Sequence, residues 1–339
     1  MVSNGNEHDI QVEGLQKNFG ELEAVKDLEL QVPHGEIFGF LGPNGAGKST
    51  TIRMLCTLLR PSGGSASVAG YDIVTEAPEV RRNIGLVAEK IILYDRLSAK
   101  ENLYFFGRMN HMPEEEIKQR SAKWLDRLGM TEWKDKLTGT FSTGMKQRVN
   151  IARALLTSPR IMFLDEPTLG LDPQTTRAIR SFIKEMGEQG ITVILTTHQM
   201  AEAEMLCDRI SIMDHGTIVA LDTATKLKGL IGNGEGTVLD VLIDGLTEEM
   251  RQAITSLPGV KGLAESEAGR LRITTTRPSA LGAVMQAVRD GGGTILSMNT
   301  LEPNLEDVFL HLTGAEMRVE LSSVVPSGHP QMGRTKRVR

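Results

Sequence analysis

The sequence predicts an α/β protein in which helices cover a parallel β-sheet, with a smaller α+β unit following it. An apolar run at residues 37–41 leads into a glycine-rich loop and a helical pattern at residues 48–59, as a buried strand followed by a helix would. Two more apolar runs lie at residues 161–164 and 191–195. Between them, apolar residues recur at helical spacing, at Ile179, Phe182, Ile183 and Met186. This strand–helix–strand rhythm is typical of a parallel sheet.

Other local signals place further elements. Short β-rich runs broken by glycine and proline predict strands between residues 9 and 41, and residues 210–220 predict a hairpin. Residues 98–157 are helical in pattern. There, Ser98 and Glu101 form a capping box, Pro113 precedes three glutamates, and Gly129 marks a helix end.

A glycine-rich stretch at residues 229–236 predicts a linker that divides the chain into residues 1–230 and residues 236–315. The second part alternates in the order β-α-β-β-α-β, so we expect a small ferredoxin-like accessory domain. It ends in a helix with an expected buried face of Leu305, Val308, Phe309 and Leu312. Residues 316–339 predict a disordered basic tail, either solvated or touching anionic lipid.

Composition excludes some classes of protein. The 339 residues are 40% hydrophobic and 24% charged, with a net charge of −5, so no basic field suggests a nucleic-acid partner. No apolar run reaches the roughly 18 residues of a membrane span, and the N-terminus lacks a signal region. The two cysteines, Cys56 and Cys207, have no metal spacing and fit a reducing compartment.

Residues 42–49 read Gly-Pro-Asn-Gly-Ala-Gly-Lys-Ser and match the phosphate-binding pattern G-x-x-x-x-G-K-[ST]. Gly45 and Gly47 let the backbone curl so that its N–H groups point at phosphates. Lys48 would reach the β- and γ-phosphates, and the Ser49 hydroxyl would ligate Mg²⁺. The alternative is a chance glycine-rich turn, which the apolar strand before it and the helix after it disfavour.

An acidic pair, Asp165 and Glu166, follows the apolar run 161–164. Ligands bind at the carboxyl ends of parallel strands. Asp165 would therefore hold Mg²⁺ through water, and Glu166 would polarise the water that attacks the γ-phosphate. An isolated Asp-Glu pair is usually a solvated loop, but the buried strand and the phosphate loop favour the functional interpretation.

Four further motifs, taken in order with these two, make the chain resemble the ABC (ATP-binding cassette) ATPases over residues 9–230. Phe19 stands where that family stacks an aromatic ring on adenine, and residues 141–145 (Phe-Ser-Thr-Gly-Met) are similar to its signature motif. Residues 169–172 resemble the loop after the acidic pair. His198 stands where the family places its γ-phosphate sensor. Alone, His198 would be a structural histidine and Phe19 a core residue.

The resemblance implies a P-loop NTPase (RecA-like) core with an antiparallel β subdomain and a helical signature subdomain. It implies ATP and Mg²⁺ as cofactors, and a homodimer in which the signature of one copy completes the site of the other. Ser142 and Gly144 begin an apolar helix, which is an anion site in its own right. The implied catalytic residues are Glu166, His198 and Lys48; the nucleotide-binding residues are Phe19, Gly42, Pro43, Asn44, Gly45, Ala46, Gly47, Lys48, Ser49, Thr50, Ser142, Gly144 and Asp172; and the metal ligands are Ser49, Glu89 and Asp165.

The sequence departs from the family at several positions. Glu89 stands where the family usually has a glutamine; a carboxylate can still ligate Mg²⁺. Thr143 and Met145 replace signature residues, and Leu169 replaces a polar one. None of these changes removes a catalytic group, so we expect an active ATPase.

Residues 302–310 resemble a segment of exporter ATPases of the drug- and antibiotic-resistance type, in the daunorubicin-resistance branch. The resemblance implies an integral-membrane permease as partner and a peripheral place at the cytoplasmic face of the membrane. Residues 90–96 are the expected docking patch, through Ile91, Ile92, Leu93 and Tyr94, unless they form a buried connection. The alternative function is a soluble ABC ATPase acting on ribosomes or DNA; an importer is a variant of the first. The sequence does not name the cargo.

Overall fold

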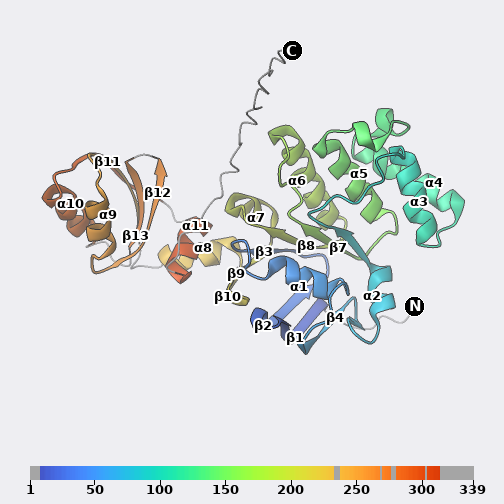
Figure 1. Ribbon diagram of the computed structural model, residues 1–339, viewed down its shortest axis with the longest axis horizontal. Coiled ribbons are helices and arrows are strands. Elements are labelled where there is room, and N and C mark those ends of the chain that lie inside the picture. Colours follow the sequence, from blue (N-terminus) through green and yellow to red (C-terminus); the bar gives the residue numbers. More distant parts are fainter. Residues whose placement is uncertain (1–7, 233–236, 268, 276–279, 302–303, 314–339) are drawn as a thin grey trace, which may run out of the picture.

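The computed structural model describes residues 8–232, 237–267, 269–275, 280–301 and 304–313, which form three β-sheets and the helices around them. Figure 1 shows two of the sheets stacked in the larger part of the molecule and the third, carrying β11–β13, set apart beside α8 and α11. The predicted α/β architecture with a parallel sheet is confirmed.

The central sheet has the strand order β10-β9-β3-β8-β7-β6. Every neighbouring pair from β9 to β6 is parallel, and β10 is an antiparallel edge strand, as the predicted hairpin requires. All residues of β3 and β7 are buried, which explains their unbroken apolar runs. The carboxyl ends of five strands therefore meet at one edge. The six strands of this sheet are β3 (Ile37–Leu41), β6 (Ile84–Val87), β7 (Ile161–Asp165), β8 (Thr192–Thr197), β9 (Arg209–Asp214) and the antiparallel β10 (Thr217–Asp222).

A second, antiparallel sheet covers one side of the central sheet, with helix α1 between them (Figure 1). Ile52, Met54 and Leu55 of α1 (Lys48–Leu55) share one apolar core with Phe38 and Phe40 of β3. The helix is shorter than the predicted 48–59. The second sheet has the order β2-β1-β4-β5, from β1 (His8–Phe19), β2 (Leu22–Pro33), β4 (Gly63–Val68) and β5 (Tyr71–Asp72), and α2 (Ala77–Asn83) follows it.

The other side of the central sheet carries the helical layer, which includes α3, α4, α5, α6 and α7. The Ser98–Glu101 capping box is present at the start of α3, and Gly129 has the left-handed φ of +67° that ends a helix. Two short 3-10 turns lie between α4 and α5. The helices are α3 (Ala99–Met109), α4 (Glu114–Arg127), α5 (Thr143–Leu155), α6 (Pro173–Glu188) and α7 (Met200–Leu206).

The third sheet is antiparallel, with the order β12-β13-β11-β14, and its elements follow the predicted sequence β-α-β-β-α-β. Helices α9 and α10 cover one face through an apolar core that includes Val241, Ile254 and Val288. The elements are α8 (Ala224–Gly232), β11 (Thr237–Asp244), α9 (Glu248–Thr255), β12 (Val260–Glu267), β13 (Arg270–Thr275), α10 (Ala280–Asp290), β14 (Thr294–Leu301) and α11 (Leu305–Thr313).

Two details of this region were predicted wrongly. Residues 229–232 are the last turn of α8 and not linker, because Leu227 and Ile231 pack against Leu305 and Phe309 of α11. The buried face of α11 includes Leu310 in place of Leu312, which is 37% exposed. The predicted tail at residues 316–339 and the first two residues of the 302–310 segment lie outside the described residues.

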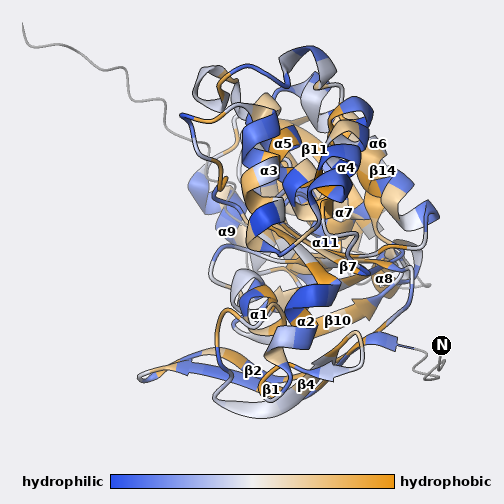
Figure 2. Ribbon diagram, turned by 90° about the vertical axis from the view of Figure 1, so that its right-hand side faces the viewer, coloured by the Kyte–Doolittle hydropathy of each residue, from blue (hydrophilic) through white to orange (hydrophobic). Residues whose placement is uncertain are grey.

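Figure 2 shows hydrophobic residues along the strands and hydrophilic ones on outer helices such as α2. Among the described residues, no helix has the length and apolar character that a bilayer crossing needs.

Candidate active site

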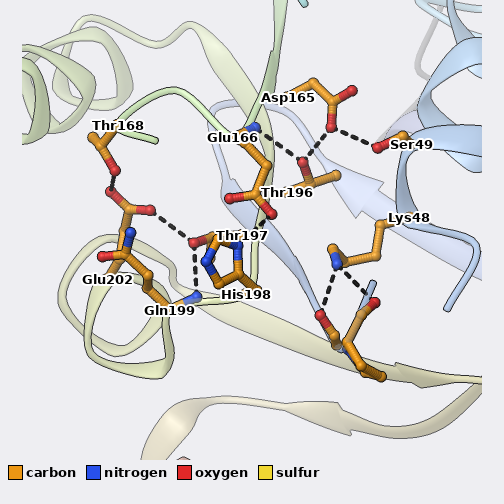
Figure 3. Close-up of polar contacts among 12 residues, drawn as sticks. Lys48, Ser49, Asp165, Glu166, Thr168, Thr196, Thr197, His198, Gln199 and Glu202 are labelled. Atoms are coloured by element: carbon orange, nitrogen blue, oxygen red, sulfur yellow. Dashed lines mark hydrogen bonds and ion pairs between the residues drawn. The ribbon is translucent and has the colours of Figure 1, made fainter. Parts of the chain in front are cut away.

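The phosphate loop connects the buried carboxyl end of β3 to helix α1. Gly47 caps the helix at a φ of +104°, and a Cβ at this position would lie 2.6 Å from the carbonyl oxygen of Ala24. Only glycine fits there. The Lys48 side chain folds back over the loop, where its Nζ donates hydrogen bonds to the carbonyl oxygens of Gly42 (2.6 Å) and Pro43 (3.1 Å) (Figure 3).

The loop forms one wall of a cavity of about 400 Å³ at the carboxyl edge of the central sheet. The other residues that line it come from four separate segments: Ala24, Glu89, Glu166, Leu169 and His198. The structure thus brings residues 43–50, which include all but the first residue of the predicted phosphate loop 42–49, together with three of the predicted acidic and histidine side chains: Glu89, Glu166 and His198.

Asp165 ends strand β7 and faces the start of α1 (Figure 3). Its Oδ1 accepts hydrogen bonds from the hydroxyls of Ser49 (2.9 Å) and Thr196 (2.6 Å). Thr196 is paired with Asp165 in the β7–β8 register, and its Oγ1 also accepts the Glu166 N–H at 3.1 Å. Sequence reasoning missed Thr196, whose only signal was its place at the end of the neighbouring strand.

Glu166 has a left-handed φ of +50°, which turns the chain sharply at the end of β7. Its Oε1 lies 3.0 Å from Nδ1 of His198. Its Oε2 is buried without a hydrogen-bond partner among the described residues. Burial raises the pKa of Glu166, and the nearby His198 and Lys48 partly offset that rise. A buried carboxylate with a free oxygen and a raised pKa is suited to accept a proton from water.

Burial also lowers the pKa of Lys48, against the opposing pull of Glu166, Asp165 and Glu89. Lys48 is 6% exposed and lines the cavity, and the three carboxylates favour its charged form. An anion that enters the cavity would therefore meet one buried cation and the N-terminus of α1 together.

The donor set fits a hard cation bound beside phosphate. A hydroxyl (Ser49) and a carboxylate (Asp165) meet at 2.9 Å, and Glu89 lines the same cavity. Within the described part of the chain, no group of three or more His, Cys, Asp or Glu side chains is arranged to hold a metal ion.

Six predicted residues do not line this cavity: Gly42 and Asp165, both described above, and Phe19, Ser142, Gly144 and Asp172. Phe19 is 49% exposed at the end of β1, with Nζ of Lys17 at 5.2 Å from its ring centre. Asp172 accepts the Thr175 N–H at 2.9 Å and caps α6. Ser142 caps α5, and Gly144 packs against Thr175. Ser142 and Gly144 therefore lie outside the lining of the cavity in their own chain.

The segment after Glu89 combines both interpretations that the sequence left open. Ile92 and Tyr94 are about half exposed, whereas Leu93 packs on the main apolar core and Ile91 is half-buried. Asn102, which is fully buried, holds the segment by accepting the Tyr94 N–H at 2.8 Å and donating to its carbonyl oxygen.

In the parallel sheet the phosphate loop follows β3 and the acidic pair follows β7, and one strand, β8, lies between these two. This arrangement defines a P-loop ATPase. Residues 25–169 match the family model described as ABC transporter. The chain is 40% identical to the linearmycin resistance ATP-binding protein LnrL of Bacillus subtilis (strain 168), over 91% of this chain and 99% of that protein.

It is 37% identical to the daunorubicin resistance ATP-binding protein DrrA3 of Streptomyces coeruleorubidus, over 92% of this chain and 98% of that one. Among solved structures it resembles a dimeric post-hydrolysis state of an ATP-binding cassette bound to ADP and Pi, with a TM-score of 0.57 and 28% identity over 63% of this chain and 98% of that one. The chain belongs to the ATP-binding subunits of ABC transporters and is an ABC transporter ATPase.

Proposed function

We propose that this chain powers an exporter of drugs or antibiotics, acting from the cytoplasmic face of the membrane on a separate permease subunit. One observation carries the proposal: the likeness to two resistance proteins spans about nine-tenths of the chain and so takes in the third sheet as well as the cassette. The names of those proteins, linearmycin and daunorubicin resistance, suggest the class of cargo.

In the proposed reaction the phosphate loop holds ATP, with Lys48 and the N-terminus of α1 on the β- and γ-phosphates. Ser49, Asp165 and Glu89 would hold Mg²⁺, which neutralises developing charge on the phosphate oxygens. The free Oε2 of Glu166 accepts a proton from the attacking water, while His198, held at 3.0 Å from Oε1, orients that carboxylate and contacts the γ-phosphate.

We propose that a second copy of the chain completes the site. Ser142 and Gly144 begin helix α5 with an exposed N-terminus, and neither lines the cavity of their own chain. Asp172 would act beside them at the same contact, and Phe19 would stack on the adenine. The dimeric structure of a related cassette supports a homodimer of this kind. Hydrolysis would remove the γ-phosphate contacts and let the two copies separate.

We further propose that residues 1–230 are the motor and residues 236–315 an accessory domain with a regulatory or dimer-contact role. The permease would dock on the exposed Ile92 and Tyr94, three to five residues beyond Glu89. Because Glu89 lines the cavity, a change at the nucleotide would be passed through this short segment to the docking residues.

The partner can be identified directly. The full chain, tagged in its source cells, is purified from gently solubilised membranes, and the copurifying proteins are identified. We expect a multi-span membrane protein, in amounts that fall when Ile92 and Tyr94 are both changed to serine. Recovery with ribosomes, with nucleic acid or without any membrane protein would overturn the exporter assignment and leave the ATPase activity standing.

The unusual Glu89 gives a milder prediction. Glu89→Gln keeps a metal-binding oxygen and removes one negative charge from the cavity wall, so we expect ATP hydrolysis at no less than about half the wild-type rate. The measurement is steady-state phosphate release at saturating Mg-ATP. An inactive Glu89→Gln protein would show that this residue has been given the wrong role.

A further inference from the structure

Behind the cavity lies a fully buried carboxylate, Glu202, in the first turn of α7. Figure 3 shows it on the far side of Thr197 and His198 from the phosphate loop. It lines no part of the cavity, and the proposed reaction gives it no chemical part.

Glu202 is hydrogen-bonded to two loops that flank the site. Its Oε1 accepts from the hydroxyl of Thr168 at 2.7 Å, and its Oε2 accepts from the hydroxyl of Thr197 at 2.8 Å. Thr168 lies two residues after Glu166, and Thr197 immediately precedes His198. Both threonines are buried.

Arg180 of helix α6 supplies the compensating charge. Its Nε lies 3.1 Å from Oε1 of Glu202, and its Nη2 donates to Oε1 of Gln199 at 3.2 Å. A buried carboxylate persists only when it is paired and hydrogen-bonded, and Glu202 meets both conditions. The cluster is therefore one satisfied network.

These contacts close a ring around the two catalytic side chains. At the front, His198 Nδ1 meets Glu166 Oε1; at the back, Thr197, Glu202 and Thr168 connect the same two loops. The segment that carries His198 is therefore tied to the segment that carries Glu166 at the back as well as at the front. Loops fixed at both sides hold their side chains more narrowly than loops fixed at one.

We propose that Glu202 is a positioning residue for ATP hydrolysis, which holds His198 and Glu166 in their reactive arrangement by joining the loops at residues 166–168 and 197–199. It acts through Thr168 and Thr197 and touches neither nucleotide nor water. The inference rests on the roles proposed above for Glu166 and His198.

The test compares Glu202→Gln with a matched control in the purified full-length chain. We expect kcat for Mg-ATP hydrolysis to fall about 10- to 100-fold while KM stays within about twofold, since the phosphate loop is untouched. The control is Asp307→Asn, which also unpairs a fully buried carboxylate from an arginine, Arg272, held at 2.8 Å in the third sheet. It should lower the melting temperature and leave kcat within about twofold.

A wild-type kcat for Glu202→Gln, or an equal loss of kcat in Asp307→Asn, would overturn the inference. Should Glu202→Gln not fold, Thr168→Val removes one arm of the ring and is expected to lower kcat about 10-fold, with Thr168→Ser restoring it. An unchanged kcat in Thr168→Val would also overturn it. Glu166→Gln, measured alongside, separates the two proposals. If Glu166→Gln hydrolyses ATP normally, the proposed reaction itself is wrong. If Glu166→Gln is inactive and Glu202→Gln is normal, only the role of Glu202 is wrong.

Discussion

Glu166→Gln is expected to slow ATP hydrolysis by about 10²- to 10⁴-fold while leaving Mg-ATP binding intact. The amide has nearly the shape of the carboxylate, so the backbone turn at φ +50° and the contact with His198 can persist. What disappears is the buried, unpartnered Oε2 that can take a proton from water. Phosphate release measures the rate, and titration with a fluorescent ATP analogue measures the binding.

Two checks make this prediction specific. Glu188→Gln makes the same substitution at an exposed position at the end of α6 and should hydrolyse ATP at the wild-type rate. The pH profile gives a second check. Burial raises the pKa of Glu166, so the active carboxylate is lost, as pH falls, at a higher pH than for an ordinary glutamate. Wild-type turnover by Glu166→Gln would refute its role as general base.

Lys48→Ala is expected to weaken ATP binding itself, by about 10²-fold, because it removes a buried cation from the floor of the cavity. Two of the three N–H groups of Lys48 already donate to the carbonyl oxygens of Gly42 and Pro43, which leaves the third to a phosphate. The side chain is thus held in place before the nucleotide arrives. Equilibrium titration of the purified chain measures the dissociation constant.

The matched control for this variant is Lys184→Ala, on the exposed side of α6, which should bind ATP as the wild type does. An unchanged dissociation constant for Lys48→Ala would contradict the assignment of the phosphate loop. Lys48→Ala and Glu166→Gln should therefore differ in the step that they impair. Lys48→Ala binds ATP poorly, whereas Glu166→Gln binds ATP and does not hydrolyse it.

Much of the fold follows from local pattern. The buried strands β3 and β7 and the capping box of α3 are encoded by neighbouring residues, so they could be predicted. The early end of α1 could not, because Thr57 adopts a left-handed φ of +61° that its residue type does not favour. The helical turn at residues 229–232 was missed because packing of α8 on α11 outweighs the helix-breaking preference of glycine.

The buried face of α11 shows how tertiary context decides packing. Helical spacing alone predicted a single face ending at Leu312. In the structure α11 contacts α8 on one side, and Leu310 packs over Gly262 of β12 on another, so the buried surface is wider than one stripe.

The site residues also fall into those that a local sequence pattern predicts and those that only the fold reveals. The phosphate loop and the acidic pair have sequence patterns with a physical reason, and both could be named in advance. Thr196, Asn102 and Glu202 have no pattern of their own. Their roles arise from the β7–β8 register and from helices that bring distant hydroxyls and amides together.

The mass of the Glu166→Gln chain in solution, with and without Mg-ATP, tests directly whether two copies share the nucleotide. Sedimentation of the purified chain should show monomers in the absence of nucleotide and a dimer at saturating Mg-ATP. The dimer should be lost when Ser142 is also changed to arginine, which blocks the N-terminus of α5. A monomer at every concentration of Mg-ATP would contradict the composite site and, with it, the proposed coupling of hydrolysis to transport.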